Sequence, residues 1–418
     1  MDALTRRRFL LASGVAAGSA LAAGAGGLGL AELLRTAPAD PSGAARTKKL
    51  VLVTLYGGND GLNTVVPYTD PAYHAARPEL AYDGEEVLPL DGVLGLNPVM
   101  RGMKRLWDDK RLAVVLGVGY PKPDRSHFRS MDIWQTASPL DPVSTGWVGR
   151  WLDGTRAAPE AAVSFEPVLP PVLAGATRAG SCVGVGGLAL PSGITADAVA
   201  GLGAREPGEP ALQARAASAY RDLLRVERLV RGAEQQQSPL AGNGGAEILT
   251  TGPGGRSVLE TQLALVARCV EAGVPTQVYS VSLDGFDTHA MERAGHESLL
   301  SRLDQTLSAF VARMARTEAG RQVTVVVYSE FGRRVRANAS QGTDHGTAGP
   351  VFVLGPRVAG GFHGEQPSLT DLDDGDLKAT MDFRDIFGTL LAGVLGADPD
   401  RYLGSGYRAK RLPLFATD

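Results

Sequence analysis

Carboxylate and imidazole side chains recur in this sequence in short polar segments that follow apolar runs. They are Asp60 in GGNDGLN, Asp287 and His289 in GFDTH, Glu330 in SEFGR and His345 in GTDHG. Asp287 and His289 are two residues apart, so an extended backbone places both side chains on the same side. A carboxylate and an imidazole placed in this way form two arms of a divalent metal site, and the histidine favours zinc. The alternative for this pair is a helix cap next to a surface histidine.

A hydroxyl and two guanidinium groups extend this chemistry. Ser126, in RSHF, lies near the N-terminus of a helix expected over residues 128–136, where backbone N–H groups favour an anion or an ionised alkoxide. It is therefore a candidate nucleophile, and helix capping is the alternative role. Arg333, with Arg125 as the second choice, is suited to hold the anionic oxygens of a phosphate or sulfate group. A salt bridge at the sheet edge is the alternative role of Arg333.

Apolar runs of strand length precede or follow these segments. The runs are 48–55, 111–118, 276–283, 323–328 and 351–354. Helices are expected over residues 97–108, 128–136, 211–237, 256–272 and 380–395. Runs that are apolar throughout predict a buried, mostly parallel sheet, and amphipathic helices predict cover for its faces. The predicted fold class is therefore α/β, a doubly wound sheet sandwiched by helices, with the polar segments at the carboxyl ends of the strands.

The first residues resemble a twin-arginine export signal. TRRRFL, at residues 5–10, opens an Ala- and Gly-rich apolar run that reaches Leu30, and Ala37–Ala39 provides an A-x-A cleavage site. A membrane anchor is the alternative, but the many Gly and Ala residues make the run weakly hydrophobic. We therefore predict a signal peptide over residues 1–39, export to the periplasm or beyond, and contact with the membrane only during export. One domain is predicted over residues 40–418, with an insertion near residues 155–250.

The overall charge, the cysteines and His296 indicate which partners and metal sites are not expected. The chain has 42 basic and 45 acidic residues, a net charge of -3, and no dense basic block after the first residues, which argues against nucleic acid as a partner. Cys182 and Cys269 are as readily two buried thiols as one disulfide. Neither has a CxxC partner, which disfavours a thiolate zinc site. His296 is expected to be a solvated helix residue.

The motifs GGNDGLN, RSHF, GFDTH, SEFGR and GTDHG, in this order, resemble the secreted bacterial family catalogued as domain of unknown function 1501. The resemblance covers nearly all of the chain after the N-terminal signal. That family is in turn similar to the alkaline phosphatase and sulfatase superfamily, whose fold is a doubly wound α/β sandwich with metals at the strand ends. The resemblance implies one or two divalent ions, with zinc preferred, and a small anionic ester as substrate.

The ligands of one metal in that superfamily are an Asp and two His residues. The resemblance assigns these roles to Asp287, His289 and His345. The spacing of the first pair is shorter than is usual in the superfamily, which leaves Asp284 as an alternative ligand.

The ligands of the second metal are an Asp after the first strand, the nucleophile and an Asp-His pair. Their counterparts by resemblance are Asp60, Ser126 and Glu330. Phe331 stands where the histidine of the pair is expected, so His127 or Asp344 would have to replace that ligand.

Two functions follow from these observations. The first is an exported, metal-dependent hydrolase of phosphate or sulfate esters. The sequence has no Cys-x-Pro-x-Arg motif of the type that matures to formylglycine, so a formylglycine mechanism is not expected. The alternative is a non-catalytic exported binding protein that retains the fold and at most one metal.

Overall fold

The computed structural model describes residues 34, 46–183, 258–404 and 406–415. Its contacts divide the chain into two compact units. The first comprises Met1–Ala44, Ser144–Arg256 and Arg268–Ser280, and the second Ala45–Val143, Ser257–Ala267 and Val281–Asp418. The export signal, the helix expected over 211–237 and most of the insertion lie outside the described residues, so the predicted domain boundaries stay predictions. Within the described residues, no helix is both long and apolar enough to span a membrane.

The second unit is built on a sheet of apolar strands. Its long strands are β1 (Lys49–Leu55), β5 (Leu112–Gly119), β9 (Val323–Ser329) and β12 (Gly349–Leu354). The order is β13-β5-β12-β9-β1-β8, where β13 is Gly361–His363 and β8 is Val278–Leu283. β1 is parallel to β9 and β13 is parallel to β5, whereas β12 is antiparallel to both of its neighbours. The sheet is therefore mixed but mostly parallel.

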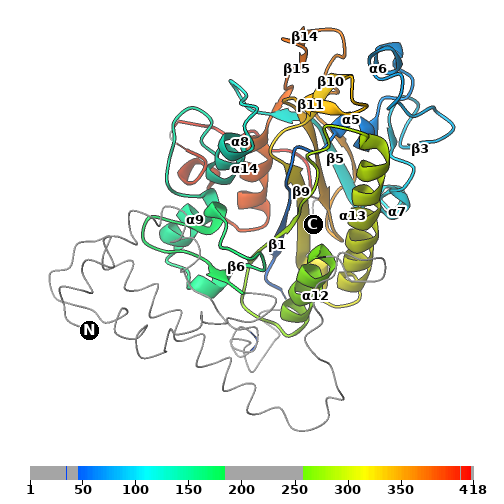
Figure 1. Cartoon of the computed structure of the whole chain (residues 1–418). Helices are drawn as coiled ribbons and strands as arrows, with labels where there is room; N and C mark the ends of the chain where they lie inside the picture. The colour runs from blue at the N-terminus through cyan, green and yellow to red at the C-terminus, as the bar shows by residue number, and fades with distance from the viewer. Residues whose placement is uncertain (1–33, 35–45, 184–257, 405, 416–418) are drawn as a thin grey trace, which may run out of the picture. The chain divides into compact units, whose positions relative to one another are not determined.

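Helices cover both faces of this sheet, as Figure 1 shows. On one face lie α7 (Arg101–Asp108) and α13 (Glu292–Met314), and on the other lie α8 (His127–Thr136) and α14 (Phe383–Gly393). Trp134 of α8 stacks on Tyr328 of β9 with ring centroids 5.0 Å apart, and it packs against Phe383 of α14 at 4.6 Å. Buried aromatic contacts thus hold the second layer to the sheet. The predicted doubly wound α/β class is confirmed.

Shorter elements complete the second unit. The helical ones are α5 (Gly61–Thr64), α6 (Pro71–Ala76), η3 (Gly320–Gln322) and η4 (Pro399–Arg401). The strands are β2 (Val65–Val66), β3 (Leu88–Pro89), β4 (Gly95–Leu96), β10 (Arg333–Ala337), β11 (Thr343–His345), β14 (Leu372–Asp373), β15 (Asp376–Leu377) and β16 (Met381–Asp382). β10 and β11 form an antiparallel ribbon directly after β9, which brings His345 back toward the end of the sheet.

The described part of the first unit centres on β6 (Ala162–Ser164). β6 runs parallel to β7 (Ser181–Cys182) and to the first residues of β8. The unit also contains α9 (Trp147–Thr155), η1 (Pro159–Ala161), η2 (Pro171–Leu173) and the end of α12 (Val258–Glu271). Cys182 and Cys269 both belong to this unit, and no disulfide joins them.

One prediction about the helices is wrong. His296, expected in solvent, has only 1% of its surface exposed. It lies on the face of α13 that packs against the loop after β1, where its Nε2 is 2.9 Å from Asn59 Oδ1 and its ring meets Phe286 edge to face. A buried polar side chain needs such a hydrogen bond, and the loop supplies it.

Candidate metal centre

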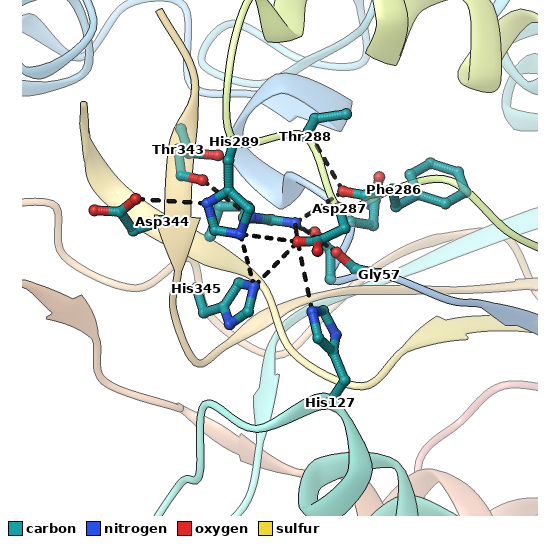
Figure 2. Close-up of polar contacts among 12 residues, drawn as sticks. Gly57, His127, Phe286, Asp287, Thr288, His289, Thr343, Asp344 and His345 are labelled. Atoms are coloured by element: carbon teal, nitrogen blue, oxygen red, sulfur yellow. Dashed lines mark hydrogen bonds and ion pairs between the residues drawn. The ribbon is translucent and has the colours of Figure 1, made fainter. Parts of the chain in front are cut away.

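Three histidines and one aspartate converge in the second unit. Asp287 and His289 lie in the loop after β8, His345 ends β11, and His127 is the first residue of α8. Figure 2 shows the three imidazoles directed at the Asp287 carboxylate from different elements. The polar segments after two strands therefore meet, and α8 contributes a further imidazole from the residue after Ser126.

Gly57, in the turn after β1, allows the backbone to approach this cluster closely. Its φ is +116°, and a Cβ added there would lie 2.4 Å from the backbone nitrogen of Asp287. The Gly57 N–H donates to Glu330 Oε1 at 2.9 Å, and its carbonyl accepts from Arg333 at 2.5 Å. Only glycine combines this φ with so close an approach.

Four nitrogen atoms surround one oxygen of the Asp287 carboxylate. Oδ1 is 3.0 Å from His289 Nε2, 3.0 Å from His345 Nε2, 3.5 Å from His127 Nε2 and 2.9 Å from Arg333 Nη2. The Nε2 atoms of His289 and His345 are 2.9 Å apart. One carboxylate oxygen offers about two lone pairs, so hydrogen bonds alone do not account for the arrangement. Ligand atoms of a tetrahedral zinc ion with bonds of about 2.0–2.1 Å stand roughly 3.3 Å apart. The ligand atoms of His127, Asp287 and His345 all lie within 4.8 Å of one another, so these three residues can bind one divalent ion.

Each imidazole is held through its other ring nitrogen. The Nδ1 contacts are His127 to Glu330 Oε1 at 2.7 Å, His345 to the Arg125 carbonyl at 2.8 Å, and His289 to Asp344 Oδ1 at 3.6 Å. A carboxylate or carbonyl acceptor keeps the proton on Nδ1 and leaves the Nε2 lone pair free for a metal. The Nε2 atom of His127 is buried and has no hydrogen-bond partner among the described residues, as expected for an atom that awaits such a ligand.

The cluster is open to solvent. The exposed fraction of its side chains runs from 23% for His345 to 49% for Asp287. Structural zinc sites are closed by protein ligands, whereas catalytic sites keep a position for water or substrate. The exposure therefore favours a site that meets a ligand from solution.

Positive neighbours set the charge of the Asp287 carboxylate. Partial burial raises its pKa, but hydrogen bonds from His345 and Arg333 lower it more, and the resulting pKa is about 2. Asp287 therefore remains an anion at any ordinary pH, as a metal ligand must.

Comparison with protein families gives one match. The family model described as "Protein of unknown function (DUF1501)" matches residues 202–412, about half of the chain. The chain belongs to the DUF1501 family. No curated protein is similar to it in sequence.

Solved structures resemble this DUF1501 chain only remotely. The protein titled Ps i-CgsB, in complex with k-i-k-neocarrahexaose, has a TM-score of 0.41 and 11% identity over 86% of this chain and 75% of its own. The lipoteichoic acid synthase LtaP from Listeria monocytogenes has a TM-score of 0.37 and 10% identity over 88% and 78%. The C-terminal periplasmic domain of EptC from Escherichia coli, in complex with Zn, has a TM-score of 0.35 and 12% identity over 89% and 91%. Similarities at this level carry no inference about activity.

Two of the residues predicted as metal ligands in this DUF1501 chain do not belong to the group of ligand atoms around Asp287. Glu330 is 1% exposed, and its carboxylate accepts from His127, from the Gly57 N–H and from Ser329 Oγ. It therefore stands one contact behind His127. Asp60 is fully buried and pairs with Arg77 Nη1 at 2.5 Å in a separate cluster.

The two residues singled out for catalysis differ in access. Ser126 is exposed at the start of α8 and makes no side-chain capping hydrogen bond. Its backbone N–H donates to Asp124 Oδ1 at 2.7 Å. Arg333 has a fully buried side chain, whose donors bind backbone carbonyls and Asp287. Arg125, the second choice, is held by Asp374 and Asp376.

Phe331 occupies one side of the cluster. Its ring centroid is 4.9 Å from that of His127 and 4.8 Å from that of His345. The ring thus packs against two of the converging imidazoles where the superfamily pattern expects a histidine. The sequence pointed to the fourth residue of the set, His127, because His127 was one of two residues expected to replace the missing histidine ligand.

Proposed function

We propose that this chain is an exported, metal-dependent hydrolase of phosphate or sulfate esters. The observation that carries the proposal is the set of three imidazoles around the Asp287 carboxylate. His127, Asp287 and His345 would hold the metal, and His289, whose Nε2 is 3.0 Å from Asp287 Oδ1, would be a further ligand. Zinc is the first choice because most of these donors are imidazole nitrogens. When bound, a divalent ion would supply Lewis-acid polarisation of the ester and activation of a nucleophile at neutral pH.

The chain's own residues prepare this site in distinct ways. Glu330 holds the Nδ1 proton of His127, and the Arg125 carbonyl holds that of His345. Arg333 donates to Asp287 and so orients the carboxylate; it is a positioning residue in this proposal. Phe331 excludes water from one side of two imidazoles.

Ser126 is proposed as the nucleophile. Its hydroxyl is exposed, is not used in capping, and belongs to the residue directly before His127. It also lies at the N-terminal end of α8, where the helix dipole stabilises an ionised alkoxide. The twin-arginine signal over residues 5–10 supports export, and it remains part of the proposal.

Metal analysis and a substrate panel test the function. Purified chain, dialysed against zinc, should retain the ion in wild type and lose it from this site in Asp287→Asn. Aryl phosphate and aryl sulfate should be tested with wild type, Ser126→Ala and the control Ser301→Ala, which changes a serine on α13. We expect hydrolysis of one ester class that Ser126→Ala lowers by at least about 100-fold and Ser301→Ala leaves unchanged.

The other outcomes are equally informative. Hydrolysis that Ser126→Ala leaves intact would overturn the role of the serine and assign the attack to water. Bound metal without hydrolysis of either ester would overturn the enzyme and favour a non-catalytic binding protein.

A further inference from the structure

A second group of metal-ligating side chains lies buried between α5 and α13. Asp60, Glu292 and His296 each offer one ligand atom, and these atoms all lie within 4.8 Å of one another. The three residues are at most 1% exposed. Glu292 and His296 are four residues apart on α13 and so share one face of the helix, while Asp60 is the N-cap residue of α5.

Each of these side chains has one satisfied atom and one without a partner. Asp60 Oδ2 binds Arg77 at 2.5 Å, Glu292 Oε2 accepts from Thr343 Oγ1 at 2.7 Å, and His296 Nε2 is 2.9 Å from Asn59 Oδ1. The remaining atoms, Asp60 Oδ1, Glu292 Oε1 and His296 Nδ1, have no hydrogen-bond partner among the described residues. Buried polar atoms left without a hydrogen bond are destabilising, so three of them in one place indicate a ligand.

The three unpaired atoms present lone pairs to one another. Asn59 Oδ1 accepts from His296 Nε2, which leaves the lone pair of the ring on Nδ1. Asp60 Oδ2 accepts from Arg77, which leaves Oδ1 as the acceptor without a partner. A proton on Glu292 would satisfy at most one of its two neighbours. A metal ion would satisfy all three atoms.

We propose that Asp60, Glu292 and His296 bind a divalent metal ion, with zinc or manganese preferred, at a buried structural site. Two carboxylates and one imidazole are a set that these ions accept. Arg77, Thr343 and Asn59 are the outer partners that hold each ligand, as is usual around metal sites.

The position of the ion explains what it would do. It would tie α13 to the turn after β1, and through Thr343 to β11, the strand that ends in His345. The two sites differ in access, since one is buried and the other is open to solvent. This inference goes beyond the proposed hydrolase and does not depend on it.

Metal content in matched variants tests the proposal. Zinc should be counted by mass spectrometry after dialysis in wild type, Asp287→Asn, Glu292→Gln and the double variant. We expect two, one, one and no ions per chain. Glu292→Gln should fold, because its amide can donate to Asp60 Oδ1 in place of the ion. If Glu292→Gln keeps the wild-type content, the buried site is refuted. If wild type and Asp287→Asn both hold one ion and Glu292→Gln holds none, the exposed site fails and the buried one stands.

A second measurement needs no change in the buried cluster. Asp287→Asn should unfold at a temperature about 3 °C higher with zinc at 100 times its dissociation constant than after chelation. An unchanged unfolding temperature, together with no retained zinc in this variant, would refute the site even if Glu292→Gln fails to fold.

Discussion

The contact between His127 and Glu330 makes a sharp prediction about metal affinity. The carboxylate of Glu330 is 2.7 Å from His127 Nδ1 and is 1% exposed. In Glu330→Gln the side chain keeps its shape but loses its charge, so a charge-assisted hydrogen bond becomes a neutral one. Loss of such an outer partner typically weakens metal binding 10–100-fold, which corresponds to about 1.4–2.7 kcal/mol. We expect zinc to bind the exposed site of Glu330→Gln more weakly by a factor in this range.

Asp344→Asn provides a matched control. It makes the same chemical change behind His289, but the atoms are 3.6 Å apart and the Asp344 side chain is 59% exposed, so water replaces the lost contact. We expect a change of less than about threefold. Titration against a chromophoric chelator measures both affinities. Equal affinities for Glu330→Gln and wild type, or equal losses in the two variants, would refute the assignment of Glu330 as the outer partner of His127.

Two further predictions concern the backbone and a thiol. Gly57→Ala should lower the free energy of unfolding by about 2 kcal/mol or more, since a Cβ there would lie 2.4 Å from the backbone nitrogen of Asp287. Gly92→Ala is the control, because a Cβ at Gly92 has nothing within 4 Å, and its free energy of unfolding should stay within about 0.5 kcal/mol of wild type. A denaturant titration measures both values. Burial, and then the charge of Glu166, raise the pKa of the Cys182 thiol to about 11, so alkylation of native protein at pH 8 should be roughly 100-fold slower than in unfolded chain. The pKa of this thiol is higher in the folded chain than in the unfolded chain, so the stability that the thiol contributes is present below pH 9 and is lost as pH rises toward 11. Mass spectrometry of labelled peptides measures the alkylation rate. A rate equal to that of the unfolded chain would contradict the prediction.

The strands and the loops that follow them were predictable because their signal is local. β1, β5, β8, β9 and β12 are runs of apolar residues, and each was predicted within two residues of its observed ends. A polar segment that directly follows such a run in the sequence must lie at the carboxyl end of that strand. The convergence of Asp287, His289 and His345 followed from that rule.

The roles of buried polar residues were not predictable in the same way. His296 looked like a surface residue because α13 shows no local sign that the face with Glu292 packs against the turn after β1. The spacing of Glu292 and His296, four residues apart, was the one available signal. Arg77 gave none, since its partner Asp60 is distant in sequence and the pairing depends on how α6 returns to the sheet.

Burial also distinguishes two roles of Arg333 that the sequence leaves open, namely binding the anionic oxygens of a substrate and forming a salt bridge within the protein. Arg333 donates to the carbonyls of Gly57, Gly58, Thr343 and Phe286 and to the Asp287 carboxylate. Its side chain is fully buried, so a substrate in solution has no access to the guanidinium. A guanidinium that is saturated in this way joins the turn after β1, the loop after β8 and β11 into one rigid frame around the imidazoles. In the proposed hydrolase, an anionic ester would therefore meet positive charge from the bound cation and the start of α8, while Arg333 keeps Asp287 in place.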